Sequence, residues 1–237
     1  MALSALMMIK LCKRLKAGDR IAAMGYPDMI ATQEQVDEQL DIFKADKSKL
    51  AYRVDSETIC KRHSRPIRQI PDAHSFFSLL GAELDVFDIV DERGCEILCD
   101  LNYPLAPEHI GQYDFVLDVG TLEHCFNVGQ AAMNMTALLK VGGTIFHQNP
   151  FNAGNHGFYS FNPTWYADFY GQGNFNLIDC RITNEERFFK APMTERFRFI
   201  EGVECGIFAI AMRTSDAALG WPMQSKYMKM AQKVANG

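Results

Sequence analysis

The sequence has no concentrated stripe of Lys and Arg, and its 29 acidic residues outnumber its 24 basic ones. The formal net charge is -5 at pH 7. Proteins that bind the nucleic-acid backbone usually carry a basic stripe, because phosphate contacts supply most of their affinity. The composition therefore argues against a nucleic-acid partner.

A long apolar run is also missing from the start of the chain. Residues 1–10 are mostly apolar, but four basic side chains lie at or after the end of this stretch rather than before it: Lys10, Lys13, Arg14 and Lys16. This order is the reverse of a secretory signal, and the stretch is too short to cross a bilayer. We expect a cytoplasmic protein without a transmembrane segment. A helix over about residues 1–17 would pack on the domain or a partner, with an interfacial membrane helix as the alternative.

The seven cysteines include no C-x-x-C pair and no spacing typical of a disulfide framework or a zinc site. An odd number of thiols with mostly apolar neighbours is typical of reduced core cysteines. Cys125 lies beside His124, but adjacent residues on a helix or turn point in different directions. A thiol-imidazole nucleophile is therefore the weaker interpretation, and we predict no metal site. The sequence has no internal repeat and no low-complexity tract.

Residues 113–147 form the most informative stretch. An apolar strand over 115–117 ends at Asp118, and a polar turn with Glu123 and His124 follows. A helix over 128–140, a stop at Gly142-Gly143 and a second strand over 144–147 complete a βαβ unit. Ligands of parallel sheets bind at the carboxyl ends of the strands, so the stretch predicts a site as well as a fold.

The remaining chain continues the alternation of strands and helices. Hydrophobic residues make up 48% of the 237 residues, which is ample for the core of one large α/β domain spanning residues 1–237. Polar residues 31–71 are interpreted as a possible insertion or cover, with helical character over 32–43. Further strands are expected over 19–25, 84–91, 95–102, 176–182 and 206–213, and further helices near 75–80 and 162–170. The charged and aromatic stretch 185–198 is expected to be an excursion that need not be ordered.

Together these motifs resemble the class I S-adenosylmethionine-dependent methyltransferases, in the small-molecule, methyltransferase type 11-like branch. The resemblance rests on an acid-tipped second and third strand, on Asp118-x-Gly120-x-Leu-Glu123-His124, and on Leu138-Leu-Lys-x-Gly142-Gly143. It is strongest over about residues 75–180. It implies a doubly wound, mostly parallel seven-stranded sheet, a Rossmann-like methyltransferase fold, with the last strand antiparallel.

The resemblance also implies how S-adenosyl-L-methionine would be bound. A carboxylate at the end of the second strand accepts both ribose hydroxyls; Asp88 is the first choice and Asp91 the second. Asp100 and Leu101 would contact the adenine, the former as an acceptor for its amine. The turn of Asp118, Gly120 and Thr121 would line the methionyl side.

The first strand departs from the family's glycine-rich motif. Ala23 stands at the position of the usual acid, and Gly25-Tyr26-Pro27-Asp28 replaces the remaining glycines, so that only Gly25 carries over. Either Asp28 or Asp118 replaces the missing partner of the cofactor's amino group, or the fold has weakened or lost cofactor binding.

Methyl transfer to an alcohol or phenol needs a base. His124, with Glu123 beside it, is the sharpest candidate, and His147 and His156 are the competitors; each could instead be a structural residue. The three imidazoles could also bind a metal with Asp118 or Glu123, but no tight His-x-His or His-x-x-x-His spacing supports this. Six aromatic residues could wall an acceptor pocket or fill the core: Phe158, Tyr159, Phe161, Trp165, Tyr166 and Phe169, of which Phe158, Tyr159 and Trp165 are the first choice.

The leading hypothesis is methyl transfer to an oxygen or nitrogen of a small-molecule or sugar-type acceptor, in a protein that could form homo-oligomers. The first alternative is a cofactor-poor relative that serves as a binding or scaffold protein. The second is an NAD-type oxidoreductase. The absence of G-x-G-x-x-G in the first turn argues against the second alternative.

Overall fold

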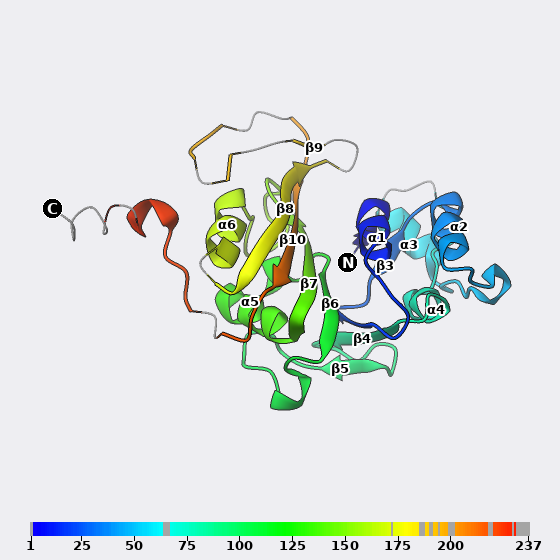
Figure 1. Cartoon of the computed structure of the whole chain (residues 1–237). Coiled ribbons are helices and arrows are strands. Elements are labelled where there is room, and N and C mark those ends of the chain that lie inside the picture. Colours follow the sequence, from blue (N-terminus) through cyan, green and yellow to red (C-terminus); the bar gives the residue numbers. More distant parts are fainter. Residues whose placement is uncertain are drawn as a thin grey trace. The chain divides into compact units, whose positions relative to one another are not determined.

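The computed structural model describes residues 2–63, 67–171, 173–184, 188–189, 192–193, 195–198, 202–217, 220–228 and 230. The chain divides into two compact units (Figure 1). Unit 1 comprises Met1–Asp100 and Tyr113–Val119, and unit 2 comprises Leu101–Gln112 and Gly120–Gly237. Whether they make a single domain, as the sequence predicts, stays a prediction.

Unit 1 is built on four parallel strands in the order β5-β4-β2-β6. Their bounds are Arg20–Met24 for β2, Glu83–Asp88 for β4, Glu96–Leu98 for β5 and Tyr113–Asp118 for β6. The last four residues of β2 are fully buried, as expected for a central strand of a parallel sheet covered on both faces. The carboxyl ends of these strands therefore lie along one edge of unit 1.

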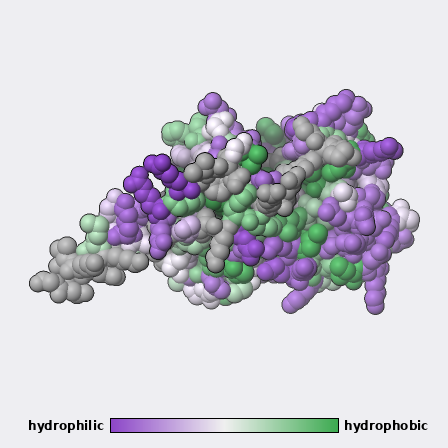
Figure 2. All heavy atoms as spheres, turned by 90° about the horizontal axis from the view of Figure 1, so that it is seen from above, coloured by the Kyte–Doolittle hydropathy of each residue, from purple (hydrophilic) through white to green (hydrophobic). Residues whose placement is uncertain are grey.

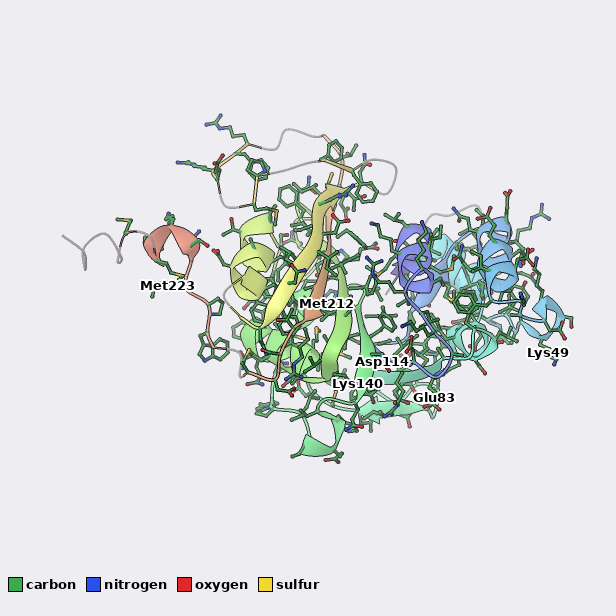
Figure 3. The ribbon with its side chains drawn as sticks, viewed as in Figure 1. Lys49, Glu83, Asp114, Lys140, Met212 and Met223 are labelled. Atoms are coloured by element: carbon green, nitrogen blue, oxygen red, sulfur yellow. The ribbon has the colours of Figure 1, made fainter. Side chains whose placement is uncertain are left out.

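The opposite edge of the same strands is held by ion pairs. Arg20 begins β2 and contacts Glu83 at 3.6 Å and Asp85 at 2.7 Å. Its backbone N–H donates to Asp114 Oδ2 at 2.9 Å. Figure 3 shows Glu83 and Asp114 at the starts of β4 and β6. The charged side chains at the amino edge thus pair with one another. These pairs do not include Asp88 and Asp118, which lie at the carboxyl edge.

A second, small sheet and the helices complete unit 1. Strand β1 (Ala2–Ser4) pairs in parallel with β3 (Asp28–Ile30). The helices of unit 1 gather around this pair in Figure 1: α1 (Ala5–Cys12), α2 (Gln33–Ile42), α3 (Ser56–Arg62) and α4 (Ala73–Leu79), with the 3-10 turn η1 (Lys47–Lys49). Helix α2 begins with a capping box between Thr32 and Gln35, which accounts for its sharp start.

The sequence placed a helix over about residues 1–17, whereas the chain opens with β1 and α1 covers only the middle of that range. The Gly25 turn leads into β3 before α2 begins. The apolar Met29 and Ile30 have an extended partner in β1, and this long-range pairing is not visible in the local pattern.

Unit 2 contains four strands in the order β7-β10-β8-β9, each antiparallel to its neighbours. Their bounds are Leu139–Pro150 for β7, Phe175–Thr183 for β8, Phe188–Phe189 for β9 and Gly206–Arg213 for β10. The predicted α/β fold class is confirmed, with a large, mostly parallel sheet and an antiparallel β10. Within the described residues β9 makes the main sheet eight-stranded rather than seven-stranded.

Helix α5 (Val128–Ala137) packs beside β7, and α6 (Pro163–Gly171) packs beside β8, as Figure 1 shows. Two 3-10 turns complete the unit: η2 (Pro107–His109) and η3 (Leu122–His124). The expected stop at Gly142-Gly143 is wrong, because β7 already begins at Leu139 and continues through both glycines. Gly142 has a φ of +87°, so the strand accommodates it as an irregularity on an exposed stretch.

None of the helices in the described part of the chain is both long and apolar enough to span a membrane. No disulfide joins the seven cysteines, all of which lie within the described residues. In the view of Figure 2, hydrophobic side chains form separate patches between hydrophilic ones.

Candidate functional site

The carboxyl edge of unit 1 carries four of the residues that the resemblance assigns to the cofactor. Gly25 follows β2, Asp88 ends β4, Asp100 follows β5 and Asp118 ends β6. Because the strands are parallel, these positions share one edge of the sheet. The arrangement is the one expected of a nucleoside-binding edge.

Asp88 is half-buried and is the last residue of β4. Its Oδ1 accepts hydrogen bonds from the backbone N–H groups of Ile89 at 2.7 Å and Val90 at 3.4 Å. The carboxylate therefore stabilises the turn after the strand. Asp91 lies three residues beyond the strand and is exposed, so the strand end coincides with the first choice rather than the second.

Asp118 is fully buried at the end of β6, whereas Asp100 is half-buried in the connection after β5. A buried carboxylate is costly unless charges or hydrogen-bond donors face it, so Asp118 marks a polar position inside an apolar sheet. Gly120 and Thr121 follow it along the chain, at the start of the second segment of unit 2. Gly120 has a φ of +99°, a conformation that few other residues adopt.

The turn after β2 is filled by a buried tyrosine. Gly25 has a φ of +77°, and Tyr26 is only 4% exposed. The Tyr26 ring lies under the guanidinium groups of Arg93 at 4.3 Å and Arg53 at 5.0 Å, and its hydroxyl donates to Asp72 at 2.5 Å. Burial and the Asp72 carboxylate raise the pKa of the Tyr26 hydroxyl, which remains a neutral donor. A bulky, fixed side chain thus fills the turn after β2.

Asp28 begins β3 and is also buried. Its carboxylate lies 3.6 Å from Arg53 Nη1 and 3.4 Å from His63 Nε2. Burial raises the pKa of this carboxyl, but the His63 hydrogen bond and the Arg53 charge lower it by more, so the net shift is downward. Asp28 is therefore bound into a structural ion-pair cluster in unit 1.

The chemistry of unit 2 centres on η3. Glu123 is 1% exposed, whereas His124 beside it is exposed. Asn149 Nδ2 donates to Glu123 Oε2 at 3.0 Å, and the Tyr166 hydroxyl donates to Asn149 Oδ1 at 2.5 Å. A chain of hydrogen bonds from α6 through β7 therefore fixes the orientation of the Glu123 carboxylate.

The loop after β7 brings a second histidine to this carboxylate. His156 Nε2 lies 3.5 Å from Glu123 Oε1, and the rings of His156 and His124 are 5.5 Å apart at their centroids. The next residues hold the loop in place, because the Phe158 N–H donates to the Glu123 carbonyl at 2.8 Å. A Cβ at Gly157 would lie 2.8 Å from that same carbonyl oxygen, so the close approach requires glycine.

His147 is placed differently from the other two histidines. It is fully buried in β7, and its Nε2 lies 2.5 Å from the Tyr170 hydroxyl of α6. The Tyr166 ring packs 5.3 Å from the imidazole. These contacts are those of a hydrogen-bonded core residue.

The predicted pocket aromatics have different surroundings. Phe158 is 65% exposed and packs edge-on against Phe126 at 5.4 Å. The Tyr159 hydroxyl donates to the Phe126 carbonyl at 2.7 Å, and Trp165 stacks on Phe169 at 5.0 Å. Phe158 and Tyr159 thus belong to the same loop as His156, whereas Trp165 belongs to the aromatic core of α6.

Asn149 was not predicted from the sequence, and Tyr166 was predicted only as an aromatic residue of the acceptor pocket or the core. Both are buried polar side chains, and each lies next to an element end: Asn149 near the end of β7 and Tyr166 in the first turns of α6. The only local signal is an amide directly after the His147-Gln148 pair. Their link to Glu123 depends on contacts between residues 17 and 26 positions apart.

No protein-family model matches the sequence, and no curated protein matches it. Among solved structures, the chain is similar to a 1,6-didemethyltoxoflavin-N1-methyltransferase from Burkholderia thailandensis, solved with bound 1,6-didemethyltoxoflavin and S-adenosylhomocysteine. The identity is 12% and the TM-score 0.49, over 88% of this chain and 76% of that chain. It is also similar to a SAM dependent methyltransferase from Aquifex aeolicus, at 8% identity and a TM-score of 0.43, over 85% of this chain and 88% of that chain. The cyclase SpnF is similar at 8% identity and a TM-score of 0.43, over 89% and 80% of the two chains. With TM-scores below 0.5, these likenesses carry no argument about the activity of this chain.

Proposed function

We propose that the protein transfers a methyl group from S-adenosyl-L-methionine to an oxygen or nitrogen of a small-molecule or sugar-type acceptor. The observation that carries the proposal is the carboxyl edge of unit 1, where Gly25 follows β2 while Asp88 and Asp118 end its neighbours β4 and β6. In the resembled family, the position of Gly25 belongs to the glycine-rich turn. The position of Asp88 binds the ribose of the cofactor, and that of Asp118 lines its methionyl part. The antiparallel β10 of unit 2 is consistent with the same fold.

The proposed chemistry divides the labour between the residues. The cofactor's sulfonium loses its methyl group in an in-line displacement, in which alignment of the acceptor supplies much of the acceleration. His124 is the proposed base, because it is exposed and lies beside the carboxylate of Glu123, with His156 as the alternative. His147 is buried against Tyr170, so it is a weaker candidate for direct contact with an acceptor.

Calorimetric titration of the full chain with S-adenosylhomocysteine tests the cofactor site. Asp88→Asn is the sharpest variant, because its amide oxygen still accepts the turn hydrogen bonds from Ile89 and Val90 while the charge is lost. We expect about tenfold weaker binding or more, as for a lost hydrogen bond to a charged group. Asp91→Asn, one exposed acid farther along, is the matched control and should bind normally.

A second function, binding or scaffolding without catalysis, is favoured by one observation. Tyr26 fills the turn after β2 and is fixed by Arg53, Arg93 and Asp72, in the segment that replaces the glycine-rich motif of the resembled family. If the wild-type chain gives no heat at high micromolar cofactor, this alternative replaces the enzyme. The same titration with NAD separates both from the oxidoreductase hypothesis.

A further inference from the structure

Three side chains that can bind a metal ion gather in unit 2. Glu123, His124 and His156 each offer one ligand atom, and these atoms all lie within 4.8 Å of one another. Two come from η3, and the third comes from the loop after β7, 32 residues later. Two imidazoles and one carboxylate are a donor set that zinc, iron and other first-row transition metals prefer, whereas magnesium and calcium prefer oxygen alone.

The distances fit such an ion. Bonds of about 2.0–2.2 Å to nitrogen and oxygen put two ligand atoms of a tetrahedral ion roughly 3.4 Å apart. His156 Nε2 and Glu123 Oε1 are 3.5 Å apart. The imidazoles of His124 and His156 are both exposed, and their planes are tilted by 32° to each other. Small rotations of the His124 side chain would therefore bring its nitrogen within bonding distance of the same ion. The carboxylate, in contrast, is buried and fixed.

The two oxygens of Glu123 face different partners. Asn149, held by Tyr166, donates to Oε2, and Oε1 faces His156. Metal-binding carboxylates and imidazoles are commonly oriented by such outer hydrogen bonds. A Cβ at Gly120 would lie 3.3 Å from Oε1, so a larger residue at this position would crowd that oxygen.

We propose that Glu123, His124 and His156 form a binding site for one divalent transition-metal ion of the zinc type. The carboxylate Oε1 and one nitrogen of each imidazole are the protein ligands. Because three protein ligands leave a tetrahedral ion one open position, and because both imidazoles are exposed, the fourth ligand is a solvent or substrate oxygen.

One consequence rests on the proposed function. At the open position the ion would lower the pKa of an acceptor hydroxyl, whose proton would then pass to solvent more readily. The resulting oxygen lone pair forms the bond to the methyl carbon, and the carbon-sulfur pair returns to sulfur, which leaves as the neutral thioether. In this arrangement the two histidines hold the ion as neutral imidazoles, and the ion replaces the base role proposed for His124.

The untagged, chelator-treated full chain is titrated with Co²⁺, and the visible absorption and the stoichiometry are recorded. We expect one ion per chain with a spectrum typical of nitrogen and oxygen ligands. His156→Ala and His124→Ala remove exposed side chains, so the fold should be retained, and each should weaken Co²⁺ binding about 100-fold or more. His109→Ala is the matched control, because His109 lies outside the cluster, and it should bind Co²⁺ like the wild type.

Binding should also weaken in acid, since protons compete with the ion for both imidazole ligands. Absence of stoichiometric binding, or binding that survives both histidine variants, overturns the proposal and leaves a His156–Glu123 ion pair as the interpretation. S-adenosylhomocysteine binding is measured on the same samples without metal. Loss of one kind of binding with the other intact therefore shows which of the two proposals has failed.

Discussion

At the scale of single residues, Gly157 is where the loop after β7 passes closest to Glu123. A Cβ at this position would lie 2.8 Å from the Glu123 carbonyl oxygen and 3.0 Å from its Cγ. Gly157→Ala should therefore displace the loop and lower the free energy of unfolding by about 1–3 kcal/mol, as overpacking does elsewhere. Urea denaturation measures the change.

Gly154→Ala is the matched control, because the same loop leaves open space around a Cβ there. It should leave the free energy of unfolding within about 0.5 kcal/mol of the wild type. Equal stabilities of the two variants would contradict the close approach between Gly157 and Glu123.

Asp28 gives a pH-dependent contribution at the same scale. Its folded pKa lies below the ordinary 3.8, because the Arg53 charge and the His63 hydrogen bond outweigh the effect of burial. The carboxylate therefore stabilises the fold fully above about pH 4, and this contribution is lost as the pH falls through the folded pKa. Asp28→Asn should cost about 1–3 kcal/mol at neutral pH.

The difference between Asp28→Asn and the wild type should shrink when both are unfolded in urea at a pH below the ordinary carboxyl pKa. Glu38→Gln, which changes an exposed carboxylate on α2, should show no such convergence. A cost that stays constant with pH would mean that the ion pairs of Asp28 do not stabilise unit 1.

At the scale of elements, α5 holds the segment that follows β5. Asn134 Nδ2 donates to the carbonyls of Leu101 at 2.9 Å and Tyr103 at 2.7 Å. Since Leu101 is a predicted cofactor contact, Asn134 is a positioning residue for that contact. Asn134→Asp places a carboxylate oxygen against two carbonyls, and we expect a loss of about 2 kcal/mol or more in stability.

Amide hydrogen exchange supplies the measurement for Asn134→Asp. The Leu105 N–H donates to Asn134 Oδ1 at 3.4 Å, so exchange at Leu105 reports on the segment directly. Gln130→Ala removes only a neighbour that donates to Asn134 at 2.8 Å, and it should leave the exchange nearly unchanged. Weaker S-adenosylhomocysteine binding in Asn134→Asp alone is expected as well.

Local pattern was sufficient for most elements. The strand that ends at Asp88 and the helix between Thr32 and Phe43 follow from periodicity, caps and strand composition. The antiparallel direction of the final strand was implied only by the family resemblance. Local pattern was insufficient where pairing partners are distant. Strand β3 forms because β1 is available, and Gly142 is accepted within β7, which no window of a few residues predicts.

The same limit applies to the site. Glu123 and His124 were found because they follow a strand, which is a local property. Asn149 and Tyr166 orient Glu123, and they reach it only through tertiary packing. His156 was predicted as one of three separate histidines, and its 3.5 Å approach to Glu123 is a property of the folded loop.

At the scale of the whole molecule, ligand binding and stability are linked. A ligand that binds only the folded chain stabilises it by about 2.7 kcal/mol at a hundredfold excess over Kd. For a chain of this size, each kcal/mol raises the midpoint of thermal unfolding by about 2–4 °C. S-adenosylhomocysteine should therefore raise the midpoint of the wild type by roughly 5–10 °C.

Asp88→Asn and the nucleotide NAD make this last measurement specific. The variant should need about tenfold more S-adenosylhomocysteine for the same shift, because the turn at Ile89 and Val90 is kept while the ribose partner loses its charge. NAD at the same concentration should give no shift, since the Gly25-Tyr26 turn offers no glycine-rich loop for a pyrophosphate. A shift with NAD and none with S-adenosylhomocysteine would assign the acids at the strand ends of unit 1 to a dinucleotide. A shift with neither would leave Tyr26 as the reason why the edge binds no nucleoside.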